Sequence, residues 1–379
     1  MSNIQNILNA IEKTARKTNF CGFDPYDGLY LNSLIGKILK SNKFGRLALI
    51  HFNKRSIINF RPLLGVRKAL NPKAAALFLS GFVKLDKLDE ANRLKERLLN
   101  NRISGCKGNA WGYYFPWQSR VFYLPANTPN AVVTCFVAHA FMDLYEKTGE
   151  SNLLTIVEGV IQFITEELNR FKDESGLCFS YSPHDHSLIY NASAFCLEVL
   201  ARFSHLTQSS TPEIEPVVEP SLNFIINDQN NDGSWYYGKQ FVQHFIDHYH
   251  TAYLLESLEN INEYTNNRFK LRPVIERGIE FYQKNLFTES FLPKFYKNAI
   301  YPIESHCVGA TIKALCRLSD NYGRHLYDLA LKVADVSIEN LFDPKRGYFY
   351  YQKRKFWTNK INYLRWSQAW MFIGLTSLL

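Results

Sequence analysis

A run of Gly and aromatic residues recurs along this 379-residue chain at a nearly fixed interval. The run lies at 112–115, 176–181, 233–237 and 347–351, with a degenerate copy at 291–296. Gly176 and Gly233 are 57 positions apart, and Gly347 follows Gly233 at twice that spacing. A fixed period of this size is typical of repeat architectures, in which each unit buries its apolar face against its neighbours. The chain is therefore expected to be a series of similar units.

Each aromatic run precedes a long apolar helix, and a turn connects that helix to a second one with more charge. Apolar residues recur every three to four positions in both, which indicates helices with one buried face. The clearest pairs are 129–147 with 152–171, 190–206 with 212–228, 248–264 with 272–286, and 304–321 with 325–341. Less regular helices are expected at 4–18, 31–39, 46–52, 62–83 and 89–99. The units are therefore helical hairpins.

The last expected helix, 362–379, is apolar on most of its sides. An open stack of hairpins would leave this helix exposed to water, whereas a closed ring buries it. We therefore predict an all-α fold, an (α/α)6-type toroid of six or seven helical hairpins that forms a single domain over residues 1–379. The first helix of each hairpin should line the inside, and the aromatic runs should lie at one rim.

Cysteine usage and hydropathy indicate the compartment. The seven cysteines form no CxxC pair, and their odd number and wide spacing do not suit a disulfide framework. The N-terminus lacks the apolar block of a signal peptide, and no stretch reaches the roughly 18 apolar residues of a membrane span. The sequence thus predicts a soluble, cytoplasmic protein.

The positive charge is concentrated in an N-terminal portion, residues 28–85. Eleven Lys and Arg residues lie between Asp27 and Asp86, and no acidic residue does. The simpler interpretation is a solvated basic face, and the functional one is an anionic partner such as an acidic glycan or phospholipid headgroups. Nucleic acid is not expected as a partner, because no nucleic-acid-binding motif accompanies the basic residues.

Polar and aromatic residues gather where the inner helices would begin. Six of the ten histidines lie at this repeat position. Aromatic rings stack on sugar faces and polar groups bind hydroxyls, so this rim is a candidate sugar-binding site. The candidate substrate-binding residues are Tyr26, Trp111, Tyr114, Trp117, Gln118, Arg120, His184, His186, Asn191, Trp235, Tyr237, His244, His306, Arg365, Trp366 and Gln368.

The densest polar cluster is the segment from Asp247 to His250. Asp247 is at a position where it can act as the N-cap of the next helix, which is a structural role. The alternative is that His248 or His250 serves as a general acid or base, since imidazole titrates near neutral pH. Metal binding is the lesser alternative, because no familiar ligand spacing is present. We predict neither a metal nor a cofactor.

Two classes of reaction suit these residues. Glycoside hydrolysis would pair Asp24 or Asp27 with a second carboxylate from Asp185, Asp247 or Glu304. Elimination or C5 epimerisation of a uronic acid would use Tyr249 or His250 as the base, with Arg365 or Asn191 contacting the substrate carboxylate. The sequence does not decide between the two.

Several motifs together resemble a known family. They are the opening segment 23–29, the repeated Gly-aromatic turns, the triplet His248-Tyr249-His250 and the terminal segment 365–370. With these the chain resembles bacterial VpsJ-like polysaccharide biosynthesis proteins over nearly its whole length. Such proteins are similar to six-hairpin glycosidases, sugar epimerases and toroidal polysaccharide lyases. The resemblance implies a role in exopolysaccharide or capsule production, and it supplies no catalytic residues.

Two hypotheses of function follow. The first is a glycan-active enzyme that binds an oligosaccharide or lipid-linked glycan, of anionic character, and hydrolyses, eliminates or epimerises it. The second is a non-catalytic glycan-binding or assembly protein that docks to a membrane or a glycosyltransferase through its basic portion. A structural scaffold, the third alternative, predicts no deep pocket.

Overall fold

The computed structural model describes residues 2–31, 38–119, 122–208 and 214–379. Within these ranges the chain forms thirteen α-helices and a set of very short strands. Six helices contact one another in sequence and form an inner ring, in which the last helix packs on the first. They are α4 (Pro72–Lys84), α6 (Ala131–Thr148), α8 (Tyr190–Thr207), α10 (His248–Tyr264), α12 (Ser305–Tyr322) and α14 (Trp370–Thr376).

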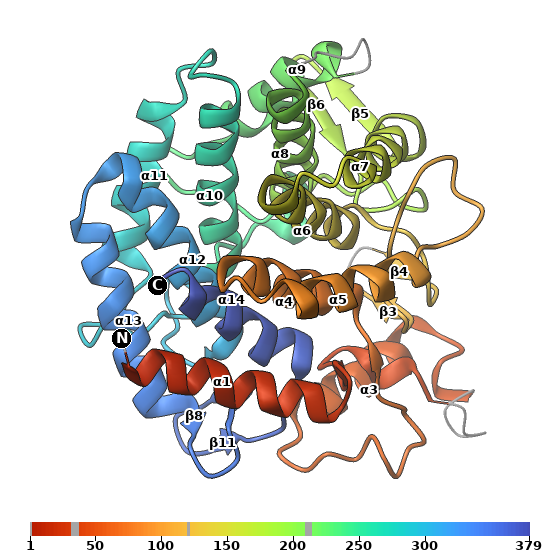
Figure 1. Cartoon of the computed structure of the whole chain (residues 1–379), viewed down its shortest axis with the longest axis vertical. Helices are drawn as coiled ribbons and strands as arrows, with labels where there is room; N and C mark the ends of the chain where they lie inside the picture. Colours follow the sequence, from red (N-terminus) through yellow and green to blue (C-terminus); the bar gives the residue numbers. More distant parts are fainter. Residues whose placement is uncertain (1, 32–37, 120–121, 209–213) are drawn as a thin grey trace.

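An outer helix packs on each inner helix. The outer helices are α5 (Leu88–Asn100), α7 (Asn152–Gln162), α9 (Glu215–Ile226), α11 (Arg272–Asn285), α13 (His325–Leu341) and α1 (Ser2–Lys17). Helix α1 is the outer partner of α14, so the two ends of the chain lie close together and complete the ring (Figure 1). The predicted (α/α)6 toroid is confirmed, with six hairpins in the part of the chain that the structure describes.

Local sequence explains why the helices begin and end where they do. Asn130 caps α6 by accepting a hydrogen bond from the Val133 amide at 3.0 Å, and Gly149 ends this helix in a left-handed conformation at φ 72°. Small residues let the inner helices approach closely. A Cβ on Gly309 would lie 2.3 Å from the Trp370 carbonyl oxygen, so α12 and α14 can pack at this distance only because position 309 is Gly.

Three expected helices differ from the observed ones, and a fourth falls largely outside the described residues. The expected helix 62–83 begins only at Pro72, because Asn71 caps it and the preceding residues form a turn around Gly65 at φ 71°. The expected helix 152–171 ends in a π-helical turn, Phe163–Glu167, and the chain then enters strand β5 (Arg170–Asp173). The expected helix 31–39 falls largely on 32–37, which lie outside the described residues. Helix α3 (Lys43–Arg55) extends the expected helix 46–52 in both directions.

The aromatic runs contribute short antiparallel pairs near the starts of the inner helices. The pairs are β1 (Cys21–Gly22) with β2 (Ala69–Leu70), β3 (Trp117–Gln118) with β4 (Tyr123–Leu124), β5 with β6 (Gly176–Phe179), β8 (Phe342–Asp343) with β9 (Tyr348–Phe349), and β10 (Gln352–Lys353) with both β7 (Ile303–Glu304) and β11 (Thr358–Asn359). These pairs, together with the 3-10 turn η1 (Asp27–Leu29), fix the backbone of the rim. The rim is where the candidate side chains gather.

Two further properties of the fold concern the thiols and the helix lengths. All seven cysteines are free thiols. Among the described helices, none combines the length and the apolar character that crossing a membrane requires.

Candidate functional site

A small cavity lies in the centre of the toroid at the end where the inner helices begin. Its volume is about 110 Å³. Typical ligand pockets measure roughly 300–1,000 Å³, so this cavity matches one sugar ring better than a chain. Its lining is aromatic and basic, and consists of Tyr26, Lys73, Tyr113, Phe115, Trp117, Val132, Tyr181, Asn191, Tyr237, Tyr249, His250, Tyr253, His306, Arg365 and Trp366. We call it the rim cavity.

The two ends of the sequence meet at the rim cavity. A parallel bridge joins Phe23 to Tyr363 and brings the opening segment beside the terminal one. Arg365 then donates two hydrogen bonds to Asp24, from Nε at 2.5 Å and from Nη2 at 2.7 Å. Both side chains are almost fully buried. This ion pair holds Arg365 against the rings of Tyr113 and Trp366 at the cavity wall.

Asp247 orients the ring of His250. Asp247 caps α10 through one carboxylate oxygen, which accepts from the His250 amide at 2.9 Å. Its other oxygen lies 2.6 Å from Nδ1 of His250. Because a carboxylate accepts, Nδ1 carries the hydrogen and Nε2 is left as the basic nitrogen. The ring lies against Tyr237 and Tyr249, and this arrangement is that of a positioned general base.

His306 supplies a second imidazole to the cavity. Its Nε2 is hydrogen-bonded to the Tyr253 hydroxyl, and its ring stacks on Tyr249 and Trp370. Burial, and then the nearby Lys73 and Arg365, lower the pKa of His306 well below its usual value. His306 is therefore neutral at pH 7, and it can exchange a proton only through its neighbours or a bound ligand.

Lys73 places an amine in the cavity wall. Its Nζ lies 4.0 Å from the ring centre of Phe136 and just over 5 Å from those of Tyr253 and Trp370. Burial, followed by the positive charge of Arg365, lowers the pKa of Lys73 well below its usual value. Cation–π attraction of about 2 kcal/mol offsets part of that desolvation. The Lys73 ammonium therefore loses its proton more readily than an ammonium on the surface does.

Two polar atoms of the cavity lining are buried without a hydrogen-bond partner, Oδ1 of Asn191 and Nδ1 of His306. Buried polar atoms in folded proteins are rarely unsatisfied, and exceptions often mark sites where a ligand or water binds. An acceptor on one wall and an imidazole nitrogen on another suit the hydroxyl groups of a sugar.

The structure separates His248 from His250. The side chain of His248 points away from the rim cavity, where Nδ1 donates to the Leu286 carbonyl at 2.8 Å and Nε2 accepts from the Tyr282 hydroxyl at 2.6 Å. Burial lowers the pKa of His248 to about 3. This residue is a neutral hydrogen-bonding group between α10 and its neighbours.

The candidate carboxylates are each engaged by other protein groups. Asp24 pairs with Arg365, and Asp27 pairs with the fully buried Arg61. Burial raises the pKa of Asp27 to about 6. Asp185 accepts from Ser182 at 2.7 Å and from the Ser187 amide at 2.9 Å, within its own turn.

Glu304 completes this set. It accepts from the Trp366 indole at 3.0 Å, and burial raises its pKa. None of these carboxylates is among the described residues that line the rim cavity. The structure thus brings no pair of carboxylates into the cavity.

The substrate-binding candidates fall into three groups. Seven line the rim cavity, together with Tyr249 and His250 from the catalytic set: Tyr26, Trp117, Asn191, Tyr237, His306, Arg365 and Trp366. His184, His186 and His244 are exposed outside it, and Arg120 lies outside the described residues.

The remaining substrate-binding candidates form hydrogen bonds within the fold and do not line the rim cavity. Trp111 and Trp235 are buried, and their indoles donate to the carbonyls of Leu98 and Ile225. The side chains of Gln118, Gln368 and Tyr114 donate hydrogen bonds to backbone carbonyls, those of Phe122, Phe349 and Gly22 respectively.

Sequence reasoning missed Lys73 and Tyr253. Lys73 is the second residue of α4, so it occupies the same start-of-inner-helix position as the other candidates. The sequence signal that could have identified Lys73 is Asn71-Pro72, an N-cap followed by Pro at the first helical position, which marks the start of a helix. Tyr253 lies one turn beyond Tyr249 on α10, on the same face.

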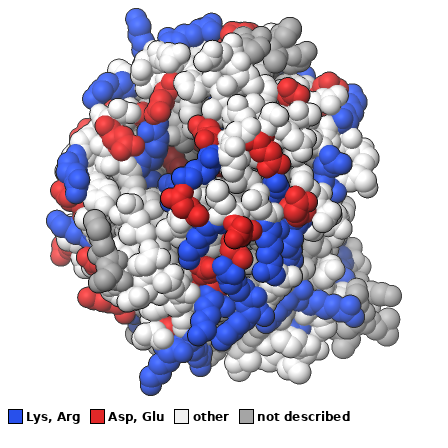
Figure 2. All heavy atoms as spheres, in the orientation of Figure 1, with Lys and Arg blue, Asp and Glu red and all other residues white. Residues whose placement is uncertain are grey.

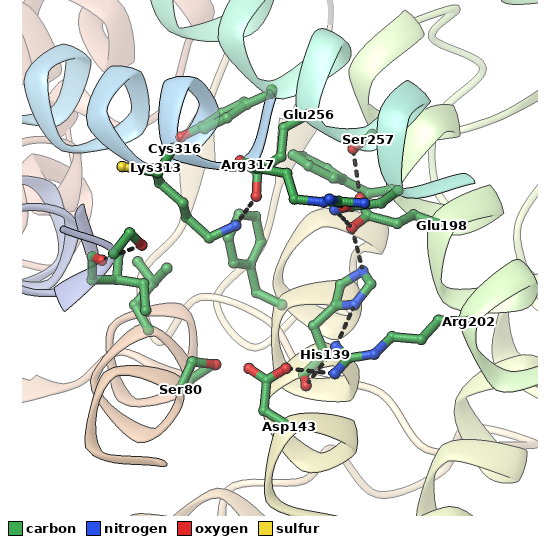
Figure 3. A pocket seen from close by; sticks show the side chains of 18 of the residues that line it. Ser80, His139, Asp143, Glu198, Arg202, Glu256, Ser257, Lys313, Cys316 and Arg317 are labelled. Carbon is green, nitrogen blue, oxygen red and sulfur yellow. Dashed lines mark hydrogen bonds and ion pairs between the residues drawn. The ribbon is translucent and has the colours of Figure 1, made fainter. Parts of the chain in front are cut away.

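A second, charged cavity of 340 Å³ lies at the other end of the inner ring. Figure 2 shows it as a hollow with acidic and basic side chains around it. The close view in Figure 3 shows that its charged groups point toward one another: Lys313 pairs with Glu256, and His139 lies between Glu198 and Arg202. Tyr253 and Trp370 form part of its floor, and Tyr253 also lines the rim cavity. Because its main charges are paired internally, this second cavity offers fewer groups to a ligand.

Comparisons with known proteins support the fold. Neither a protein-family model nor a curated protein sequence matches the chain. A solved structure of a possible GH105 family member from Klebsiella pneumoniae is similar with a TM-score of 0.65 and 12% identity, over 100% of this chain and 93% of that chain. The cellobiose 2-epimerase of Bacillus thermoamylovorans gives a TM-score of 0.63 and 10% identity, over 83% of this chain and 90% of that chain.

An unsaturated glucuronyl hydrolase specific for heparin gives a TM-score of 0.62 and 12% identity, over 100% of this chain and 96% of that chain. At these identities the similarity establishes the architecture alone. The chain has the six-hairpin (α/α)6 toroid of these enzymes.

Proposed function

We propose that the protein is a sugar-active enzyme in which His250 acts as the acid–base catalyst. The observation that carries this proposal is the Asp247–His250 pair at the wall of the aromatic rim cavity. Asp247 fixes the tautomer and the orientation of the ring, which leaves Nε2 able to accept a proton from a ligand.

The cavity lining suits a sugar. Tyr26, Trp117 and Trp366 provide ring faces and edges, and Asn191 provides an unsatisfied acceptor. Several solved structures with this fold carry names of sugar-active enzymes, a cellobiose 2-epimerase and an unsaturated glucuronyl hydrolase among them. A substrate of one sugar ring, or the end of a chain, fits the volume of 110 Å³.

Proton transfer at carbon is the reaction that these residues suit best. His250 removes a proton from the carbon next to a carbonyl or carboxylate group, and the electron pair of the C–H bond moves toward that group's oxygen. The positive charge of Arg365 stabilises the developing negative charge, since Asp24 leaves its Nη1 unoccupied. Delivery of a proton to the opposite face by a second donor or water gives the epimer, and expulsion of a group from the next carbon with its bonding electron pair, which is then protonated, gives the elimination product.

Hydrolysis fits less well. Most glycoside hydrolases need two carboxylates that flank the bond at about 5–5.5 Å or 6.5–9.5 Å. The described lining of the rim cavity contains no Asp or Glu, and the nearest candidates are engaged in buried pairs. A base-driven reaction therefore has the better support.

The test is proton exchange with solvent. The purified protein is incubated with aldoses, uronic acids and short oligosaccharides in D2O, and the products are examined by NMR and mass spectrometry. We expect deuterium at one carbon of a substrate, and loss of this exchange in His250→Gln but not in His244→Gln, which changes an exposed histidine outside the cavity. Hydrolysis products without exchange would contradict the proposal. Binding without turnover in every variant would favour the non-catalytic glycan-binding protein.

The biological setting is a prediction from the sequence, from its family resemblance, its cysteine usage and its basic N-terminal portion. It comprises exopolysaccharide or capsule synthesis, a cytoplasmic location, an anionic or lipid-linked glycan as substrate, and contact with a membrane or a glycosyltransferase. A deletion strain that loses its surface polysaccharide, and regains it with the wild-type gene but not with the His250→Gln variant, would support that setting.

A further inference from the structure

Helix α3 carries an apolar stripe on its solvent side. Phe44, Ala48 and Phe52 follow one another at intervals of four residues, which places them on one face of the helix. Phe44 is 83% exposed and Phe52 is 53% exposed. The opposite face, which holds Ile50 and Asn53, packs on η1 and β3. The helix therefore has an apolar face turned to water in addition to the face that packs on the protein.

The apolar surface continues beyond α3. Ile57 and Ile58 are more than half exposed in the segment that follows the helix, and Leu63 is 84% exposed. Phe356, in the turn between β10 and β11, is 86% exposed. This turn lies beside the end of α3, because Asn359 donates a hydrogen bond to the Ser56 carbonyl at 2.8 Å. We call Phe44, Phe52, Ile57, Ile58, Leu63 and Phe356 the α3 surface.

Exposed cations accompany these apolar side chains. Arg55, Arg67 and Lys68 come from the segment 28–85, which contains no acidic residue, and Lys355 is next to Phe356. None of these four cations forms an ion pair with a carboxylate in the described part of the chain. Figure 2 shows Lys and Arg gathered over the lower part of the molecule, where Figure 1 places α1, α3 and β11. The α3 surface therefore combines exposed apolar side chains with exposed positive charges.

We propose that the α3 surface docks the protein on a lipid bilayer that contains anionic lipids. Large apolar side chains beside Lys and Arg, on a helix face that is turned to water, are the composition of interfacial membrane anchors. Such a helix lies on the bilayer, which agrees with the lack of a membrane-spanning helix among the described residues. A second copy of the chain suits this surface less, because its cations would face those of the first copy.

Docking would place the rim cavity near the bilayer. The inner face of α3 carries Lys54, whose amine donates a hydrogen bond to the Tyr26 hydroxyl at 2.6 Å and lies over the Trp366 ring. Tyr26 and Trp366 both line the rim cavity. A sugar attached to a membrane lipid could then reach the cavity. This consequence rests on the proposed function, whereas the proposed docking to the bilayer does not depend on it.

The experiment is sedimentation of the full-length protein with lipid vesicles. Vesicles of phosphatidylcholine alone are compared with vesicles that also contain phosphatidylglycerol, at low and at high salt. We expect binding to the anionic vesicles that weakens as salt rises, and a loss of about fivefold for each cation removed in Arg55→Gln and Arg67→Gln. Phe44→Ser with Leu63→Ser should lower binding at least as strongly while the charge stays the same.

A matched control distinguishes binding through the α3 surface from non-specific binding through any exposed aromatic side chain. Phe241 is 89% exposed and lies in the 3-10 turn Phe241–Gln243, elsewhere in the chain. Phe241→Ser should leave vesicle binding unchanged, and circular dichroism should show that all variants are folded. Absence of binding to anionic vesicles at low salt would overturn the proposal. So would a dimer in analytical ultracentrifugation that Phe44→Ser with Leu63→Ser converts to monomer, if vesicle binding does not change.

Discussion

Asp24 and Arg365, which are 341 positions apart in the sequence, form a two-point ion pair at 2.5 and 2.7 Å beneath the rim cavity. The pair joins the opening segment to the last helical segment. Because both groups are buried, each depends on the other to compensate for the water it has lost. The position of Arg365 in the cavity wall thus depends on a carboxylate at the other end of the chain.

Removal of one partner of the Asp24–Arg365 pair should destabilise the fold. Asp24→Asn leaves the Arg365 charge buried without its partner, so we expect a loss of about 3–5 kcal/mol in the free energy of unfolding. Urea denaturation of the variant and the wild type measures this loss. Asp86→Asn, which breaks an exposed pair with Lys147, should cost less than about 1 kcal/mol. A small loss in Asp24→Asn would mean that water or another group solvates Arg365.

Asp247→Asn should separate capping from catalysis. The amide oxygen can still accept the hydrogen bond that caps α10, so stability should change by less than about 1 kcal/mol. The carboxylate that holds Nδ1 of His250 is lost, so the rate of the proposed proton transfer should fall, with a smaller effect on KM. His250→Gln should lower kcat by about 10²–10⁴-fold. Steady-state kinetics and thermal denaturation of the same samples provide both measurements.

Lys73→Met should stabilise the fold. Nζ of Lys73 lies among three aromatic rings, and its burial has a free-energy cost that a methionine side chain of similar length avoids. We expect a gain of about 1–3 kcal/mol in the free energy of unfolding. A simultaneous loss of sugar binding would show that the amine is retained for the ligand. Lys172→Met, on the exposed strand β5, should leave both quantities nearly unchanged.

Buried neutral histidines should make the fold sensitive to acid. The pKa of His248 is lowered to about 3 and that of His139 to about 4, against about 6.5 in the unfolded chain. As the pH falls below 6.5, the unfolded state binds protons that the folded state does not bind, so stability decreases. Between pH 7 and pH 5 each of the two rings should account for a loss of about 2 kcal/mol.

Urea denaturation at several pH values tests this expectation. His139→Gln removes one of the two titrating groups, so the difference between pH 7 and pH 5 should shrink by about 2 kcal/mol. His244→Gln, at an exposed site, should leave that difference as it is in the wild type. An unchanged slope in His139→Gln would show that this ring is protonated in the folded state.

The sequence by itself determined the architecture, because the patterns that specify each hairpin are local in the chain and repeat along it. Helical periodicity marks each hairpin, the aromatic runs set the period, and the apolar end of the chain requires a closed ring. It also located the rim, since five of the six inner helices, all but α4, follow an aromatic run. The helix start at Pro72 was misplaced because apolar residues continue upstream of Asn71 and conceal the cap.

Only the tertiary structure decided which rim residues meet. His248 and His250 are two positions apart on α10, so they face in different directions, and the pattern could not say which one faces the cavity. Asp24 and Asp27 could be assigned to hydrolysis until their partners, Arg365 and Arg61, were known. Those partners come from distant parts of the chain, and the cost of burying a charge depends on what surrounds it in three dimensions. The repeat therefore defined the scaffold, while long-range packing and charge pairing selected the site.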